Sequence, residues 1–210
     1  MNSVRELLEG AARELACASD APLAEAQILL AHALERDRSW LYAWPEHVPE
    51  ASRIAHFQES VGRRALGHPI SHLTGERDFR SLRLTVGPET LIPRPETEHL
   101  VETALQLRLP DDARVLDLGT GSGAVALALA SERPAWRITA TDQSAAALAI
   151  ARRNAARLGL HKLCFLHGDW FDVPGPLPAF DLIVGNPPYV ASGDPHLERG
   201  DVRFEPLGAL

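Results

Sequence analysis

The first third of the chain has the apolar spacing of amphipathic helices. One helix is predicted near the start, where apolar residues recur at intervals of three and four: Val4, Leu7, Leu8, Ala11, Ala12 and Leu15. A second is predicted over Ala24–Leu34 and a third over Glu50–Leu66. Residues 39–49 carry three large aromatic residues and two prolines, which predicts a packed connection rather than a regular element. Residues 1–75 therefore predict a small all-helical domain.

The pattern changes to short strands after this region. Phe79, Leu82, Leu84 and Val86 suggest short strands, and Gly87-Pro88 is predicted as the turn. Residues 76–95 are therefore predicted to form a hairpin linker.

From Glu96 onward, strand and helix patterns alternate. After a helix that starts at Glu96, the predicted elements are strand Val115–Leu118, helix Ala124–Ser131, strand Ile138–Thr141, helix Ser144–Leu158, and strands Leu163–Leu166 and Phe180–Val184. Such alternation is typical of a parallel sheet with crossover helices. The predicted fold class is α/β, with a Rossmann-like domain over residues 96–210 that follows the helical domain.

Composition and charge narrow the class of protein. The 210 residues carry a net charge of −7, negative in both predicted parts, which argues against a protein that depends on phosphate contacts with nucleic acid. Cys17 and Cys164 are far apart, and Pro69 interrupts a helix that would join His68 and His72, so no metal site is predicted. We find no apolar run long enough to cross a bilayer and no secretion signal, so we expect no membrane partner and a cytoplasmic location.

The first strand of the α/β part ends in a glycine-rich loop, Gly119-Thr120-Gly121-Ser122-Gly123. Alternate glycines allow a tight turn and a close approach of the backbone to a ligand, and the following helix offers free N–H groups. Asp142 ends the second strand, where a nucleotide-binding fold places its ribose-binding acid. This pattern predicts a cofactor site, although it fits NAD as well as other nucleotides and a ligand-free turn is the alternative.

The third strand leads into Asp169 and Trp170. At the carboxyl edge of a parallel sheet, Asp169 could accept a hydrogen bond from an adenine amino group and the Trp170 ring could cover the base. A capping aspartate and a core tryptophan are an equally good interpretation of this segment alone.

The fourth strand delivers Asn186-Pro187-Pro188-Tyr189 to the same edge. The lone pair of a planar amide or aromatic amine is delocalised, so a site that uses such a nitrogen as nucleophile must orient its NH₂ group. The Asn186 side-chain carbonyl and the Pro187 backbone carbonyl can each accept one N–H bond, and Tyr189 can stack on the planar group. The two prolines keep the acceptors rigid. These four residues are the predicted catalytic residues.

Taken together, "LDLGTGSG", Asp142, "GDW" and "NPPY" resemble the class I S-adenosylmethionine-dependent methyltransferases. The whole chain is similar to the bacterial HemK/PrmC family of release factor glutamine methyltransferases, in segments that include "HPISHLTGERDF", "TLIPRPETEHLVE" and "DPHLERGDVRFEPL". Members of this class continue beyond the fourth strand, so we expect a domain truncated there, with its C-terminal part missing and the fourth strand an exposed apolar edge.

The resemblance implies methyl transfer to the side-chain amide nitrogen of the glutamine in the Gly-Gly-Gln motif of class I peptide release factors. It implies that residues 119–123, Asp142, Asp169, Trp170 and also Asn186 hold S-adenosylmethionine, which becomes S-adenosylhomocysteine. It further implies that Asn186 to Tyr189 hold the glutamine and that the helical domain docks the release factor. We expect a monomer with no direct nucleic-acid contact.

Three other functions fit part of the sequence. An NAD-dependent dehydrogenase would use the glycine loop and Asp142 but leaves Asn186-Pro187-Pro188-Tyr189 without a role. An amino methyltransferase acting on an adenine or guanine amine of DNA or RNA would use the same chemistry, but it usually needs a cationic surface. A cofactor-sensing adaptor would not need the intact Asn-Pro-Pro-Tyr segment.

Overall fold

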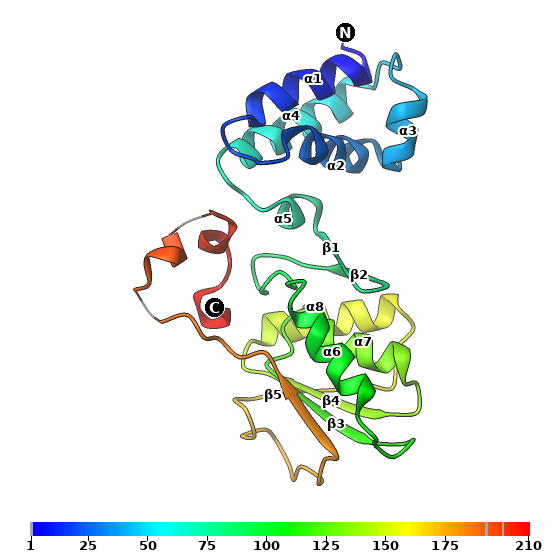
Figure 1. Ribbon diagram of the computed structural model, residues 1–210, viewed down its shortest axis with the longest axis vertical. Helices are drawn as coiled ribbons and strands as arrows, with labels where there is room; N and C mark the ends of the chain where they lie inside the picture. Colours follow the sequence, from blue (N-terminus) through cyan, green and yellow to red (C-terminus); the bar gives the residue numbers. More distant parts are fainter. Residues whose placement is uncertain (1, 192, 199) are drawn as a thin grey trace. The chain divides into compact units, whose positions relative to one another are not determined.

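The computed structural model describes residues 2–191, 193–198 and 200–210 (Figure 1). Met1, Ser192 and Arg199 lie outside the described residues. The segment "DPHLERGDVRFEPL" over residues 194–207 is therefore described only in part. The chain divides into two compact units, the first ending at Thr74 and the second spanning Gly75–Leu210.

The first unit is helical. Its elements are α1 (Val4–Leu15), α2 (Pro22–Leu34), α3 (Arg38–Ala43), α4 (Ala51–Ala65) and α5 (Ile70–Thr74). Ser3 caps α1 in a capping box with Glu6, which satisfies backbone N–H groups that the first helical turn leaves free. Leu15, Leu30 and Phe57 are among the fully buried side chains that join α1, α2 and α4 in one apolar core.

One sequence prediction for this unit is wrong. The aromatic region around residues 39–49 is not wholly irregular, because α3 occupies Arg38–Ala43. This helix has six residues and buries only Leu41, so it is too short to show a repeating apolar stripe.

The second unit begins with an antiparallel hairpin of β1 (Glu76–Phe79) and β2 (Leu82–Thr85). Because Phe79 pairs with Leu82, the hairpin turn lies at Arg80-Ser81. The predicted turn at Gly87-Pro88 is present, since the Thr90 N–H donates to the Gly87 carbonyl at 3.1 Å, but it follows β2 and does not join the two strands. Arg80 has a positive φ of 50°, and its backbone N–H donates to the Glu98 side chain at 3.1 Å. A carboxylate 18 residues away therefore supports a turn that lacks glycine or asparagine.

The hairpin predicted as a linker contributes to the core of the second unit. Phe79 and Leu84 are almost completely buried there, and they belong to the same apolar cluster as helix α7 (Ala124–Glu132). The remaining helices of this unit are α6 (Thr97–Gln106) and α8 (Ala145–Arg157), and three short 3₁₀ turns follow at Pro195–Glu198, Gly200–Phe204 and Leu207–Ala209.

The main sheet is parallel and has the order β5-β4-β3-β6, which confirms the predicted Rossmann-like fold (Figure 1). Its strands are β3 (Arg114–Leu118), β4 (Arg137–Asp142), β5 (Cys164–His167) and β6 (Leu182–Gly185). Leu118 at the end of β3 pairs with Thr141 of β4 and with Gly185 of β6. Three strands therefore end level with one another, and their following loops emerge at one edge.

Strand β6 is an edge strand of the described sheet, as expected from the sequence. Ile183 on this strand is 49% exposed. Proline follows almost at once, at Pro187, which prevents the ladder from continuing along this segment.

Asn154 on α8 ties the hairpin to the glycine-rich loop. Its side-chain oxygen accepts from the Thr85 N–H at 2.7 Å, and its NH₂ group donates to the carbonyls of Thr85 and Ser122, both at 2.9 Å. The Asn154 side chain has no exposed surface and its bond to Ser122 is buried, while the two bonds to Thr85 are half-buried. Three backbone groups on two separate segments thus depend on one buried carboxamide.

We predict that Asn154→Ala lowers the free energy of unfolding by roughly 2–4 kcal/mol, because it leaves these three backbone groups without their partner. The measurement is chemical denaturation of the full-length protein. The exposed neighbour Arg153→Ala is the control and should stay within about 0.5 kcal/mol of wild type. Equal stabilities of the two variants would contradict this role for Asn154.

Candidate active site

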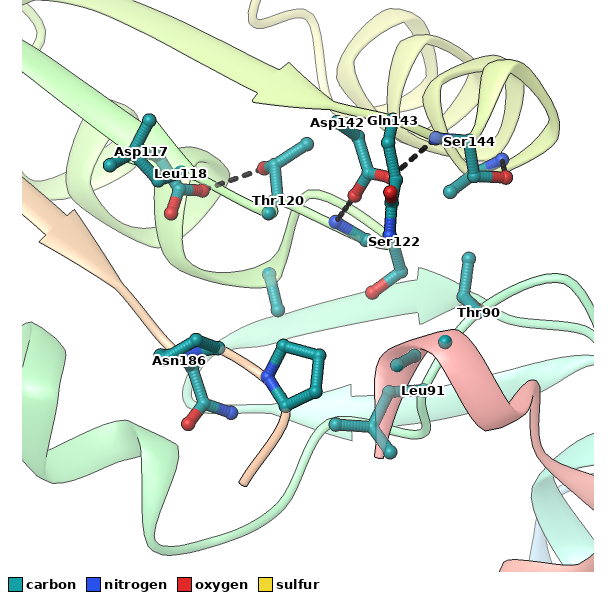
Figure 2. Close-up of a pocket in the computed structure, with 18 of the residues that line it drawn as sticks. Thr90, Leu91, Asp117, Leu118, Thr120, Ser122, Asp142, Gln143, Ser144 and Asn186 are labelled. Carbon is teal, nitrogen blue, oxygen red and sulfur yellow. Dashed lines mark hydrogen bonds between the residues drawn. The ribbon is translucent and has the colours of Figure 1, made fainter. Parts of the chain in front are cut away.

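A cavity of about 560 Å³ lies at the carboxyl ends of the parallel strands in the second unit. Ligands of open α/β sheets bind at this edge, and the volume is in the range of small-molecule and cofactor sites. Figure 2 shows Asp117, Thr120, Asp142 and Ser144 on one side of the hollow and Asn186 and Leu91 on the other. Of the predicted site residues, the cavity is lined by Gly119, Thr120, Gly121, Ser122, Asp142, Asp169, Trp170, Asn186, Pro187 and Pro188.

The glycine-rich loop forms one wall of this cavity. Gly119 and Gly121 have φ values of 69° and 57°, which is the left-handed conformation that residues with a Cβ rarely adopt. The Thr120 N–H donates to the Thr141 carbonyl at 2.9 Å, so the loop is held against the end of β4. The turn therefore presents its backbone, rather than side chains, to a ligand.

Asp142 is held in a fixed orientation at the end of β4. One carboxylate oxygen accepts from the Gly121 N–H and the other from the Ser144 N–H, both at 2.8 Å (Figure 2). Each carboxylate oxygen has a second lone pair, so both can still accept a hydroxyl group. This arrangement suits a ribose diol next to the glycine loop.

Trp170 reaches the cavity from a strained turn after β5. Its φ is 50°, and its side chain is 51% exposed at the cavity rim. A Cβ on Gly168 would lie 2.1 Å from the Asp172 carbonyl oxygen, so only glycine allows the chain to turn here. The turn places a broad aromatic face beside Asp169, as a site for a flat base requires.

Only part of the Asn-Pro-Pro-Tyr segment lies at the cavity. Asn186, Pro187 and Pro188 line the cavity, whereas the Tyr189 side chain is 82% exposed and does not. The backbone N–H groups of Tyr189 and Val190 donate to the Leu210 carbonyl at 2.9 and 2.8 Å. The segment is therefore anchored by its backbone, and the aromatic ring stays at the surface.

Gly123 also lies outside the cavity lining. It has a φ of 88°, and a Cβ there would lie 2.9 Å from Leu127 Cδ1 and 3.2 Å from the Ala151 Cβ. In this structure the third glycine leaves room for Leu127 and Ala151 at the start of α7, which is a packing role.

Asp117 is a cavity residue that the sequence reasoning missed. Its side chain is buried at the penultimate position of β3 and accepts from the Thr120 hydroxyl at 2.6 Å (Figure 2). Burial raises the pKa of Asp117 to about 6, although hydrogen bonds from Thr120 and from the Ala126 N–H lower it in part. An acid within an otherwise apolar strand, "VLDLG", was the available signal.

The ion pair between the half-buried Arg94 and the buried Glu205 was not predicted from the sequence either. Arg94 Nη2 lies 2.5 Å from Glu205 Oε1, and the other carboxylate oxygen accepts from the Ile92 N–H at 3.1 Å. The Glu205 side chain has no exposed surface, and burial raises its pKa against the opposing effect of Arg94. Arg94 and the neighbouring Pro206 line the cavity, so this pair fastens two segments into one wall.

Neither a metal site nor a membrane-spanning helix is found in the part of the chain that the structure describes. Within residues 2–191, 193–198 and 200–210, no group of three or more His, Cys, Asp or Glu side chains could hold a metal ion. Within the same ranges, no helix is long and apolar enough to span a membrane.

The residues present fit a nucleoside cofactor with an electrophilic group. The glycine loop offers a close backbone approach, Asp142 offers acceptors for a diol, and Trp170 offers an aromatic face, while Asn186 and Pro187 line the same cavity. A parallel Rossmann-like sheet with this combination at its carboxyl edge is the arrangement expected of a class I S-adenosylmethionine-dependent methyltransferase.

Comparison with known proteins identifies the family. Residues 6–75 match the PrmC N-terminal domain and residues 96–199 match the methyltransferase small domain. The release factor glutamine methyltransferase of Shewanella oneidensis is 49% identical over 207 residues, which cover 99% of this chain and 72% of that protein. The protein of the same name from Escherichia coli is 50% identical over 194 residues, 92% of this chain and 69% of its own. This chain belongs to the family of release factor glutamine methyltransferases.

Among solved structures, the Pyrococcus abyssi tRNA (uracil-54, C5)-methyltransferase in complex with S-adenosyl-L-homocysteine matches with a TM-score of 0.45. It is 18% identical, and the match covers 54% of this chain and 28% of that chain. The family relationship, rather than this distant likeness, identifies S-adenosylmethionine as the cofactor. It also favours a methyltransferase over the dehydrogenase alternative.

We predict that Gly123→Ala destabilises the protein more than Gly159→Ala does. Both glycines have positive φ, but a Cβ at Gly159 has open space around it. The Gly159→Ala variant should lose roughly 1–2 kcal/mol from backbone strain alone, and Gly123→Ala should lose more because of its contacts with Leu127 and Ala151. Chemical denaturation measures both, and equal losses would contradict the packing role.

The raised pKa of Asp117 predicts that the free energy of unfolding falls as pH rises. Its folded pKa of about 6 lies above the ordinary 3.8, so its contribution to stability is complete below pH 3.8 and is lost as pH rises through 6. The loss amounts to roughly 3 kcal/mol. Asparagine does not ionise. We therefore expect the free energy of unfolding of Asp117→Asn to rise relative to that of wild type as the pH increases from 3.8 through 6.

Urea titrations at several pH values between 4 and 7, without cofactor, measure this effect. The exposed Asp111→Asn serves as the control and should show no such trend. A stability difference between Asp117→Asn and wild type that stays constant with pH would contradict the raised pKa.

Proposed function

We propose that this protein transfers a methyl group from S-adenosylmethionine to the side-chain amide nitrogen of the glutamine in the Gly-Gly-Gln motif of class I peptide release factors, and so supports translation termination. The products are N5-methylglutamine and S-adenosylhomocysteine. One observation carries this proposal: in a chain about half identical to release factor glutamine methyltransferases, Asn186 and Pro187 line the same cavity as the glycine loop and Asp142.

In this proposal, the glycine loop and the strand ends hold the cofactor. The Gly119–Ser122 backbone approaches the ligand closely, Asp142 accepts from the ribose hydroxyls, and Trp170 and Asp169 contact the adenine. Bound S-adenosylmethionine supplies an electrophilic methyl group on its sulfonium sulfur.

Asn186 and Pro187 orient the nucleophile. The Asn186 side-chain oxygen and the Pro187 carbonyl each accept one N–H bond from the glutamine NH₂ group, which restricts how the nitrogen presents its lone pair. The nitrogen–carbon bond forms as the carbon–sulfur bond breaks, and the nitrogen then loses its proton to water. Exposed Tyr189 is free to stack on the incoming amide when the release factor arrives.

We further propose that the helical unit docks the release factor and that the protein acts as a monomer in the cytoplasm, without direct contact with nucleic acid. The match of residues 6–75 to a domain found in this family supports the docking role. So do Tyr42 and Trp44, large side chains that stay exposed on this unit and could be covered by a partner.

Methyl-labelled S-adenosylmethionine tests the substrate. Full-length protein is offered a purified release factor, the variant of that factor with Gln→Ala in its Gly-Gly-Gln motif, and bulk DNA and RNA in separate reactions. Label in the intact release factor alone supports the proposal. Label in DNA or RNA, with none in the release factor, would move the same chemistry to a base amine and contradict it.

We predict that Asn186→Ala lowers kcat at least about 100-fold and changes the Kd for S-adenosylmethionine less than about threefold, because the lost acceptor faces the glutamine. Asp142→Ala is the contrasting variant and should raise that Kd roughly tenfold or more. Calorimetric titration gives the Kd values and label transfer gives kcat. A large loss of cofactor affinity in Asn186→Ala would assign Asn186 to the cofactor site instead.

A further inference from the structure

Thr97 contacts the side chain on which the proposed reaction depends. The first residue of α6 places its hydroxyl oxygen 3.4 Å from Asn186 Nδ2, and both side chains line the cavity. The bond is long, as hydrogen bonds in a free active site often are before the substrate tightens them. It is the only hydrogen bond that the Asn186 carboxamide makes within the described residues.

The two ends of a carboxamide differ in chemistry and hardly at all in shape. The oxygen end accepts hydrogen bonds and the NH₂ end donates them, so the bonds around the group decide which end faces a ligand. A glutamine NH₂ group brings two donors to the cavity and needs an oxygen opposite it. With Nδ2 directed to Thr97, the Asn186 oxygen is the end left for the glutamine.

Both partners are fixed by their backbones. The Thr97 N–H donates to the Arg94 carbonyl at 3.1 Å, and Arg94 is in turn held by Glu205 at 2.5 Å. On the other side, Gly185 pairs with Leu118 in the sheet directly before Asn186. The hydroxyl and the carboxamide therefore meet at a place set by two separate parts of the fold.

We propose that Thr97 is a positioning residue that holds Asn186 in its productive orientation. In the orientation that the structure shows, the Thr97 hydroxyl accepts from Nδ2, and the Asn186 oxygen stays turned toward the glutamine. This inference rests on the proposed function, because it assumes an amide nitrogen as the substrate. Thr97 itself need not touch the glutamine, so its effect passes through Asn186.

Two substitutions at Thr97 separate the hydroxyl from the shape of the side chain. Thr97→Val keeps the volume and removes the hydroxyl, whereas Thr97→Ser keeps the hydroxyl. We expect kcat for release factor methylation to fall roughly 5- to 10-fold in Thr97→Val, the worth of one hydrogen bond. Thr97→Ser should stay within about twofold of wild type, and the Kd for S-adenosylmethionine should change less than about twofold in both.

The control is Thr103→Val, which makes the same change at an exposed position on the same helix and should leave kcat unchanged. Thr97→Val with wild-type kcat would overturn the proposal. So would an equal loss in Thr97→Ser, or a loss of cofactor affinity that matches the loss of kcat, because each assigns another role to Thr97.

A second measurement does not depend on activity. The side-chain NH₂ resonances of Asn186 in the full-length protein are identified by their absence in Asn186→Ala. In Thr97→Val these protons should exchange with solvent roughly fivefold faster or more, since their acceptor is gone. Unchanged exchange overturns the proposal. Wild-type protein that fails to methylate release factor, with this exchange difference present, would refute the proposed function and leave the contact itself intact.

Discussion

The parallel pairing of β3 with β4 and β6 is the interaction on which the site depends. Leu118 pairs with Thr141 on one side and with Gly185 on the other, so the glycine loop, Asp142 and Asn186 leave the sheet at the same level. A shift of one residue in either pairing would turn the side chains of the shifted strand to the opposite face. The two walls of the cavity, with the glycine loop and Asp142 on one and Asn186 on the other, therefore meet because of backbone register.

Buried polar groups then hold the loops that the strands deliver. Asn154 joins the hairpin to the glycine loop, Asp117 holds Thr120, and Glu205 joins Arg94 to the C-terminal segment. Burial of such groups is costly unless each finds a partner, and here each has one or more. The raised pKa of Asp117 shows that part of this cost remains in the folded protein. A preorganised cavity is thus obtained at some expense in stability.

Much of this site could be predicted from local sequence. Gly119 and Gly121 indicate a left-handed backbone conformation, and Asn186–Pro188 indicates a rigid end to a strand. Both features can be recognised from a few consecutive residues of the sequence. Contacts between distant segments leave no local pattern: Glu205 lies 111 residues from Arg94, and the Arg80 turn is supported by Glu98. Which residues of a motif face the cavity also depends on packing, which is why Gly123 and Tyr189 lie outside it.

The central claim is that oxygens of Asn186 and Pro187 hold a glutamine nitrogen opposite the reactive methyl. A crystal structure of the full-length protein with S-adenosylhomocysteine and a Gly-Gly-Gln peptide tests it most directly. The account predicts the glutamine Nε2 within about 3 Å of Asn186 Oδ1 and of the Pro187 carbonyl oxygen, with the cofactor sulfur on the nitrogen's open side. A glutamine side chain bound elsewhere, or one whose carbonyl oxygen faces the sulfur, would contradict it.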